Sequence, residues 1–269
     1  MLEPANGWLS LRLGELWAYR ELLYFFIWRE IKVRYKQTAL GASWALLQPV
    51  LTMVIFSVIF GRLANLDSEG IPYPVFTFAA LLPWQLFSRA LSDASGSLVA
   101  AQNMITKVYF PRLFLPAAAV LSGLVDFAIA FIVQLALMLV YGITPTLAIL
   151  ALPFFLLLAV VTAMAAGMWL SALNVRYRDV KYVTPFLIQL WLFGTPIAYS
   201  AQLIPEQFRV LYGLNPLAGV VNGFRWALLG QQTTLDPLLF GSSIAMVIIL
   251  FISGLIYFQR TEQTFADIV

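Results

Sequence analysis

Charged residues within apolar stretches are the first candidates for chemistry. Arg89 and Asp93 lie four residues apart in one such stretch, and Asp126 is the lone acid in the next. A charge at the middle of a bilayer costs about 2.5–3.5 kcal/mol, so such residues normally mark an ion or proton pathway. The spacing favours a local ion pair between Arg89 and Asp93 over a gating role. Asp126 faces either a partner subunit or a polar pathway, and the sequence leaves both open.

Residues for bond-making chemistry are otherwise scarce. The chain has no Cys and no His, which excludes disulfides, thiolate chemistry and the usual zinc or haem ligands. We find no G-x-x-x-x-G-K-[ST] phosphate loop, no dinucleotide-binding glycine pattern and no cluster of metal ligands. We therefore expect no enzyme, no metal and no cofactor bound by this chain. If ATP drives the protein, another chain must bind it.

Aromatic rings gather beside Pro83, Gly194 and Pro196, which weaken the helices around them. A flat apolar ring packs against the C–H face of a sugar without fixing one hydrogen-bond geometry, so a long glycan could slide along such rings. Ordinary packing is the alternative for any single ring. The predicted passage-lining residues are Phe78, Trp84, Phe87, Trp191, Phe193 and Tyr199.

The elements that must position these residues are membrane helices. Of the 269 residues, 61% are hydrophobic and 11% are charged, which is typical of an integral membrane protein. The sequence predicts one all-α domain over residues 1–269, with an interface segment at 1–40, a membrane domain at 41–258 and a tail at 259–269. Six spans are expected, at 41–60, 75–96, 113–141, 147–173, 183–200 and 238–258.

Two segments are apolar but do not read as spans. Tyr24, Ile27, Trp28, Ile31 and Tyr35 share one helical face, which predicts an amphipathic helix on the membrane surface. On another face of this helix, the acid at position 30 precedes the arginine at position 34 by one turn. Residues 201–237 are too short and too interrupted to cross, so we expect a re-entrant helical pair between spans five and six. An external loop with an interfacial helix is the alternative.

The basic residues set the orientation. With the amino terminus inside, cytoplasmic stretches hold 12 Lys or Arg and external ones hold three, namely Arg62, Arg209 and Arg225. This bias predicts that both termini are cytoplasmic. Residues 103–112 form a short amphipathic segment ended by a proline, which suits docking to a partner. Residues 174–181 mix basic and aromatic side chains on the same side. The net charge of +3 gives no argument for nucleic acid.

The chain resembles the permease subunits of type-2 ATP-binding-cassette exporters, in the branch that exports O-antigen, capsule and teichoic-acid-like polymers. The resemblance covers nearly the whole length. Its motifs are W-R-E-I-K-V-R-Y-K and L-G-A-S-W-A-L-L-Q-P at 28–49, K-V-Y-F-P-R at 107–112 with Pro116 beyond, L-N-V-R-Y-R-D at 173–179, F-G-T-P-I-A-Y at 193–199 and N-P-L at 215–217. No carbohydrate-recognition segment is found.

The resemblance implies a homodimer with a passage between the two copies, paired with two separate ATPase subunits that use ATP and Mg. It implies a lipid-linked polysaccharide as substrate and a location in the bacterial inner membrane. Cations near the headgroup plane attract phosphate, so Arg176, Arg178 and Lys181 are expected at the substrate entrance, on its pyrophosphate. Residues implied to couple to the ATPase are Asn103, Lys107, Tyr109, Phe110, Pro111, Arg112, Glu30 and Arg34.

Three other functions stay open at this level. A related permease could export a smaller amphiphile or a drug. A membrane-embedded lipid or sugar transferase would need acidic or His residues clustered at the membrane surface, and Asp67 with Glu69 is the only external acidic pair. A channel or ion-coupled carrier is disfavoured, since no inverted repeat with paired broken helices is found and buried charges are few.

Overall fold

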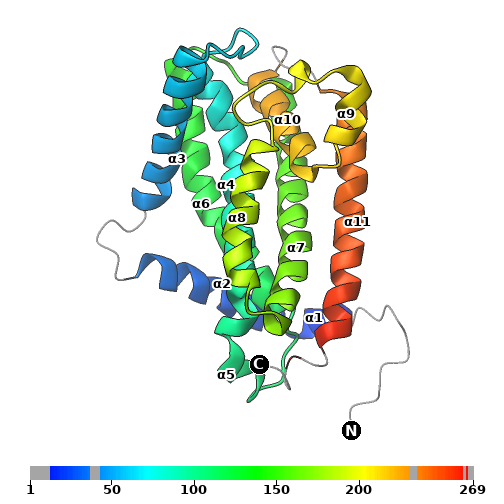
Figure 1. Ribbon diagram of the computed structural model, residues 1–269. Coiled ribbons are helices and arrows are strands. Elements are labelled where there is room, and N and C mark those ends of the chain that lie inside the picture. Colours follow the sequence, from blue (N-terminus) through cyan, green and yellow to red (C-terminus); the bar gives the residue numbers. More distant parts are fainter. Residues whose placement is uncertain (1–12, 37–42, 231–234, 263–264, 266–269) are drawn as a thin grey trace.

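The computed structural model describes residues 13–36, 43–230, 235–262 and 265, and these form helices and connecting turns with no strand among them (Figure 1). Parts of the predicted interface segment and tail lie outside the described residues. The helices are α1 (Leu13–Ala18), α2 (Arg20–Tyr35), α3 (Ser43–Phe56), η1 (Ser57–Leu63), α4 (Tyr73–Ala100), α5 (Gln102–Ile105), α6 (Phe114–Val140), η2 (Leu147–Ala151), α7 (Leu152–Arg176), α8 (Val180–Phe193), η3 (Ala201–Leu203), α9 (Glu206–Tyr212), α10 (Pro216–Leu229) and α11 (Pro237–Glu262).

Within the described residues, four helical stretches are long and apolar enough to cross a membrane, namely 43–63, 114–140, 147–176 and 237–262. They correspond to four of the predicted spans. Helix α4 covers the second predicted span with 28 residues. Helix α8 has only 14 residues and ends at Phe193, seven residues before the predicted end of the fifth span. The reason is local, because Gly194 caps the helix and Pro196 follows without a backbone donor.

Helix α4 is the centre of the bundle. It lies against α6 and α7 along its length and against α3, α8 and α10 over shorter stretches. Phe76, Phe78 and Phe87 of α4 are completely buried in the main apolar core. Close approach is possible where residues are small: a Cβ at Gly223 of α10 would lie 2.0 Å from the Phe155 ring, so α10 packs on α7 only with glycine there.

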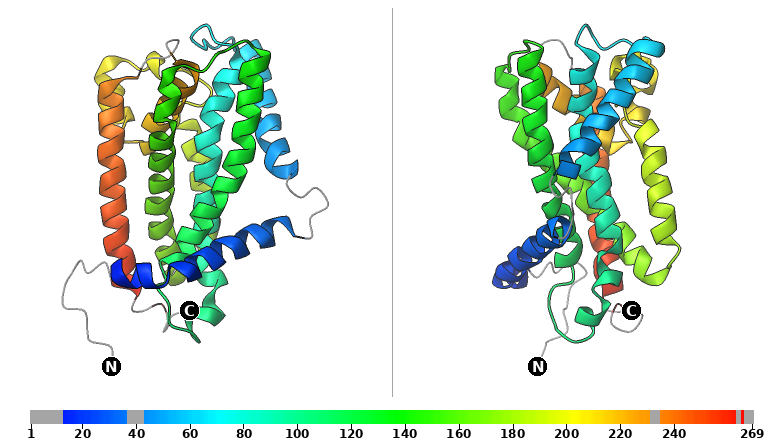
Figure 2. Two further views of the ribbon diagram at one scale, coloured as in Figure 1. Left: turned by 180° about the vertical axis from the view of Figure 1, so that it is seen from behind. Right: turned by 90° about the vertical axis from the view of Figure 1, so that its left-hand side faces the viewer.

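Helix α2 lies across one end of the bundle instead of along it (Figure 2). Its inward face carries Leu22, Leu23, Phe26 and Ile27, with Phe26 fully buried. The predicted apolar face is therefore half wrong: Ile27, Ile31 and Tyr35 face inward, whereas Tyr24 and Trp28 are exposed. The helix is apolar on both sides, so periodicity alone could not select the packed one.

Two short helices, α9 and α10, occupy the end of the bundle opposite α2 and α5 (Figure 1). They fall where the sequence predicts a helical pair and are joined by a turn at 213–215. None of the residues of α9 is buried, whereas nearly every residue of α10 is.

Candidate functional site

The predicted coupling segment splits into an outward and an inward part. Asn103 and Lys107 are exposed, and Tyr109 is 57% exposed with its hydroxyl 3.4 Å from a carboxylate oxygen of Glu15. Phe110 is only 3% exposed. Its ring packs edge-on against Phe26 of α2, at 5.4 Å between centroids.

The inward part continues beyond Phe110. Pro111 is partly buried, and so is Arg112, whose backbone N–H donates to a carboxylate oxygen of Glu262 at 3.2 Å. The Arg112 guanidinium also donates to the Glu262 carbonyl oxygen. The segment is thus fastened to both α2 and the end of α11.

This split predicts different outcomes for two neighbouring substitutions. Phe110→Ala removes a buried ring and is expected to destabilise the protein by about 3–5 kcal/mol. Tyr109→Ala removes an exposed ring and is expected to leave unfolding within about 0.5 kcal/mol of wild type. Thermal unfolding of the solubilised protein measures both effects. Equal losses of stability in the two variants would contradict the division of the segment into an exposed and a buried part.

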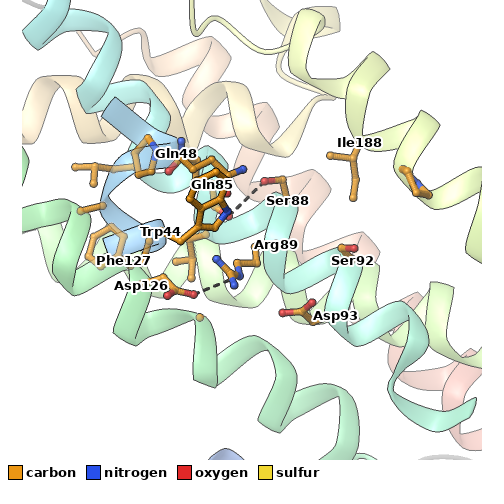
Figure 3. A pocket seen from close by; sticks show the side chains of 17 residues that line it. Trp44, Gln48, Gln85, Ser88, Arg89, Ser92, Asp93, Asp126, Phe127 and Ile188 are labelled. Atoms are coloured by element: carbon orange, nitrogen blue, oxygen red, sulfur yellow. Dashed lines mark hydrogen bonds and ion pairs between the residues drawn. The ribbon is translucent and has the colours of Figure 1, made fainter. Parts of the chain in front are cut away.

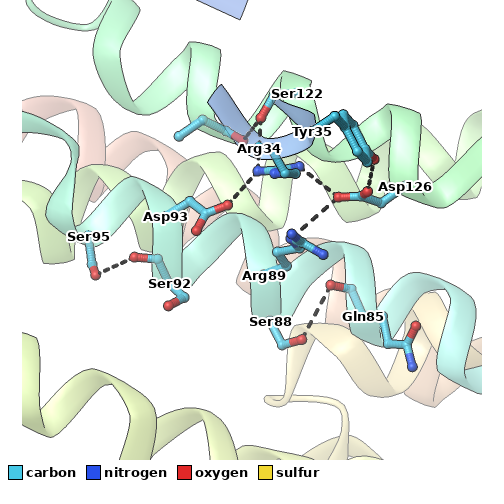
Figure 4. A network of polar contacts seen from close by, with 11 residues as sticks. Arg34, Tyr35, Gln85, Ser88, Arg89, Ser92, Asp93, Ser95, Ser122 and Asp126 are labelled. Carbon is cyan, nitrogen blue, oxygen red and sulfur yellow. Dashed lines mark hydrogen bonds and ion pairs between the residues drawn. The ribbon is translucent and has the colours of Figure 1, made fainter. Parts of the chain in front are cut away.

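A charged network connects α2 to the bundle (Figure 4). The Arg34 guanidinium donates to Asp126 of α6 and to Asp93 of α4, both at 2.6 Å. It also lies 3.3 Å from the Ser122 hydroxyl. Asp126 accepts a further hydrogen bond from the Tyr35 hydroxyl and lies 3.4 Å from Nε of Arg89.

This network corrects the ion pair that was predicted from helical spacing. The Arg34 side chain, which the resemblance assigns to coupling, is 12% exposed and points between α4 and α6. Arg89 pairs with Asp126 and not with Asp93, because Arg34 already occupies Asp93. Glu30 pairs with its neighbour Arg29 at 2.7 Å.

The network is electrically balanced. It holds two guanidinium groups, Arg34 and Arg89, and two carboxylates, Asp93 and Asp126. Burial raises the pKa of Tyr35 to about 12, and its hydrogen bond to Asp126 adds to the shift. The hydroxyl therefore stays protonated and donates to Asp126 throughout the physiological range.

A cavity of about 400 Å³ lies beside this network (Figure 3). Residues of α3, α4, α6 and α8 line it, and Arg89, Asp93 and Asp126 belong to its wall. The sequence leaves open whether Asp126 faces a partner subunit or a polar pathway. The structure places its carboxylate between Arg34 of α2 and this cavity.

The predicted entrance residues lie on the surface around the turn from α7 to α8. Arg176, Arg178 and Lys181 are all exposed. The Arg176 guanidinium lies 5.5 Å from the centre of the Tyr177 ring, and the Lys181 ammonium lies 4.7 Å from that of Tyr182. Just before them, the buried Asn174 amide donates to the Ser95 carbonyl at 2.8 Å and ties this end of α7 to α4.

The predicted passage-lining rings do not form one surface. Phe78, Trp84 and Phe87 are buried among side chains of their own chain, so in this conformation none of them faces a passage between two copies. These three rings lie on the covered side of α4, within the main apolar core. The Phe193 ring is exposed at the end of α8. Trp191 packs edge-on against Phe87, and the Tyr199 and Tyr212 hydroxyls lie 2.6 Å apart.

A profile of the ABC-2 type transporter family matches residues 21–229. The chain belongs to this family. Among its relatives, the O-antigen export system permease protein RfbA of Myxococcus xanthus is 29% identical over 94% of this chain and 97% of the relative. RfbA of Klebsiella pneumoniae is 30% identical over 97% of this chain and 98% of the relative. The polysialic acid transport protein KpsM of Escherichia coli is 25% identical over 87% of this chain and 91% of the relative.

Asn215 belongs to the N-P-L motif at 215–217, but the sequence did not indicate a role for its side chain in this ABC-2 family chain. Its side-chain oxygen accepts from Trp191 Nε1 at 2.7 Å and caps α10 through the Leu217 N–H. Its amide nitrogen donates to the Gly194 carbonyl and the Thr195 hydroxyl. An Asn before a Pro signals a helix start. Nothing in the spacing signals the tie to α8.

Arg225 is a second such residue of the family chain. The sequence places it in an external stretch, but it is 2% exposed inside α10. Its guanidinium lies 3.5 Å from the centre of the Phe76 ring and donates to the backbone carbonyls of Phe76, Ile197 and Tyr199. The basic count treated it as a loop charge. In the structure, its side chain links α10 to α4 and to the segment after α8.

Within the described residues, no group of three or more Asp and Glu side chains is placed to hold a metal ion. The acidic pair Asp67 and Glu69 makes hydrogen bonds within the chain. Asp67 accepts from the Glu69 backbone N–H at 3.1 Å, and Glu69 accepts from the Ser200 hydroxyl.

Proposed function

We propose that this chain is the membrane-spanning permease of an ATP-driven exporter that moves lipid-linked polysaccharide across the bacterial inner membrane. The observation that carries the proposal is its 29–30% identity to O-antigen export permeases over 94–97% of its length. The relation to a polysialic acid transport protein points to the same substrate class. The chain itself does no bond-making.

In the proposed topology, the six spans are α3 with η1, α4, α6, η2 with α7, α8 and α11. Both termini are cytoplasmic, so α2, α5 and the α7–α8 turn lie on the cytoplasmic side. Helices α9 and α10 form the re-entrant pair in the outer leaflet. The nearly complete burial of α10 supports this, because backbone at membrane depth must be covered by protein.

The working unit is proposed to be a homodimer with two separate ATPase subunits, which hold the ATP and Mg. The second copy is placed on the side of α3 and α8. Helix α8 supports this placement, since Thr184 is its only buried residue and its apolar side chains Phe186, Leu190 and Phe193 are exposed.

The coupling route is proposed to run from the exposed part of the docking segment inward. An ATPase that presses on Asn103, Lys107 and Tyr109 moves Phe110, which packs on Phe26 of α2. Helix α2 then acts on α4 and α6 through Arg34. Buried contacts transmit such displacements well, because packed interiors have low compressibility.

The test is reconstitution. The chain and its partner ATPase are placed together in lipid vesicles that contain the lipid-linked polymer, and polymer transfer is followed with and without ATP. We expect transfer only with both chains and ATP. Transfer or ion conduction by the chain alone would overturn the proposal. Movement of a small amphiphile without polymer would favour a narrower exporter.

The entrance role gives a prediction of its own. Replacing Arg176, Arg178 and Lys181 together by Gln removes three cations from the proposed pyrophosphate contact. We expect the KM for the lipid-linked polymer to rise at least about tenfold, since charged hydrogen bonds contribute about 1.5–3 kcal/mol each. ATP hydrolysis without polymer should stay at the wild-type rate. Unchanged polymer transfer would remove these residues from the entrance.

A further inference from the structure

The cavity between α3, α4, α6 and α8 has polar groups left over by the protein itself. Among the described residues, the side-chain amides of Gln48 and Gln85 and the Ser92 hydroxyl have no hydrogen-bond partner. Arg89 contacts Asp126 only through Nε, so its two terminal nitrogens have none either. The second carboxylate oxygen of Asp93 is also unpaired, since Arg34 bonds the first.

These groups converge on one space from three helices. Figure 3 shows Gln48 of α3, Gln85 and Arg89 of α4 and Asp126 of α6 around the same cavity, with Trp44 beside the two glutamines. Gln48, Ser92 and Asp93 are exposed and Gln85 is partly buried, so their polar groups are open to water or to a ligand. The volume of about 400 Å³ lies within the range of small-ligand sites.

The charge balance decides the class of ligand. Two arginines face two carboxylates in and beside the wall, so the site has no net charge to attract an anion. A phosphate would also meet the unpaired oxygen of Asp93. A neutral molecule with many hydroxyls pairs with amides, a carboxylate and a guanidinium at once, because hydroxyls both donate and accept.

Trp44 adds a requirement on the shape of the ligand. Trp44 is 51% exposed at the cavity, so part of its ring is open for contact. An indole face packs against an apolar face, and a sugar ring has C–H groups on its face and hydroxyls around its edge. This combination distinguishes a sugar from water, which needs no apolar platform.

We propose that this cavity binds an uncharged sugar residue of the exported glycan, with Trp44 as the stacking platform and Gln48, Gln85, Ser92, Arg89 and Asp93 as hydrogen-bond partners. The proposal rests on the function proposed above and deepens it. It places a sugar contact on the face of the chain that borders α3 and α8, in addition to the surface cations that are assigned to the pyrophosphate.

Photo-crosslinking tests the site. Ile188→p-benzoylphenylalanine places a reactive group on the α8 wall of the cavity. Ile248→p-benzoylphenylalanine is the matched control, since Ile248 lines a wholly apolar groove between α7 and α11. Each variant is produced with the partner ATPase in cells that make the lipid-linked polymer, and adducts on the purified complex are stained for carbohydrate. We expect a carbohydrate adduct at position 188 and none at 248.

Substitutions in the same background then test the residues. Gln48→Leu with Gln85→Leu is expected to lower the adduct yield about tenfold, and Trp44→Leu about fivefold, whereas Trp44→Phe keeps more than half of it. Gln207→Leu on exposed α9 is the control for the glutamines and should change nothing. Yields are normalised to complex that elutes as a single species and hydrolyses ATP at the wild-type basal rate, which excludes misfolded chains.

The outcomes separate this proposal from the function. Polymer export by the wild type without a carbohydrate adduct at 188 would overturn the sugar site and leave the exporter intact. An adduct of phospholipid alone, or a carbohydrate adduct that survives the double glutamine substitution, would also overturn it. Absence of polymer export by the wild-type chain with its ATPase would overturn the function itself.

Discussion

Arg34→Leu is expected to destabilise the protein by about 3–5 kcal/mol, because it leaves Asp93 and Asp126 with a single counter-charge in a partly buried network. The network changes from balanced to one excess negative charge. For a chain of this size, the loss corresponds to a fall in the apparent Tm on the order of 10 °C. Thermal unfolding of the detergent-solubilised protein, followed by the remaining monodisperse fraction, measures it.

Two further variants show whether charge is the cause. Arg34→Leu combined with Asp93→Asn restores one cation to one carboxylate, and we expect it to recover at least half of the lost Tm. Arg29→Leu breaks an exposed pair with Glu30 and should cost less than about 1 kcal/mol. If the double variant is as unstable as the single one, the lost packing of the arginine is responsible and the electrostatic explanation fails.

Arg225→Leu is expected to abolish accumulation of folded protein. The change leaves the carbonyls of Phe76, Ile197 and Tyr199 without their buried donor, at about 1.5–3 kcal/mol for each hydrogen bond to a charged group. It also removes the contact with the Phe76 ring. The amount of the protein in the membrane fraction and its elution profile measure the effect.

A lysine at position 225 tests whether a positive charge alone is sufficient there. Arg225→Lys keeps the charge but replaces a planar fork of donors by one ammonium, which cannot serve three carbonyls in different directions. We expect it to fail nearly as badly as leucine. Arg62→Leu, at an exposed position near the same end, should accumulate normally. Full stability of the lysine variant would show that charge alone is needed.

The fold was largely predictable because hydrophobic length is a local property. The third span was expected at 113–141 and α6 runs from 114 to 140. Helix ends were predictable where glycine or proline marks them, as in the turn after Val140. The fifth span was overextended because the apolar run continues past Gly194, where the helix has already ended.

The site was less predictable because it depends on pairing between distant segments. Arg34 lies 59 residues from Asp93 and 92 from Asp126, so no local spacing could connect them. The helical repeat predicted that Arg89 pairs with Asp93. In the structure, Arg34 of α2 pairs with Asp93, and Arg89 pairs with Asp126 instead. Likewise, the basic character of Arg225 indicated a loop, whereas in the structure it is buried and bonded to carbonyls of Phe76 in α4 and of Ile197 and Tyr199 after α8.

Asn215 has a mechanical consequence for the outer part of the chain. One side chain is bonded at once to the last turn of α8, to Gly194 and Thr195, and to the first turn of α10. Because these bonds share a single rigid amide, α8 cannot slide along its axis without dragging α10 after it. In the proposed topology, a push on the turn from α7 to α8 would therefore be passed through Asn215 to α10 in the outer leaflet.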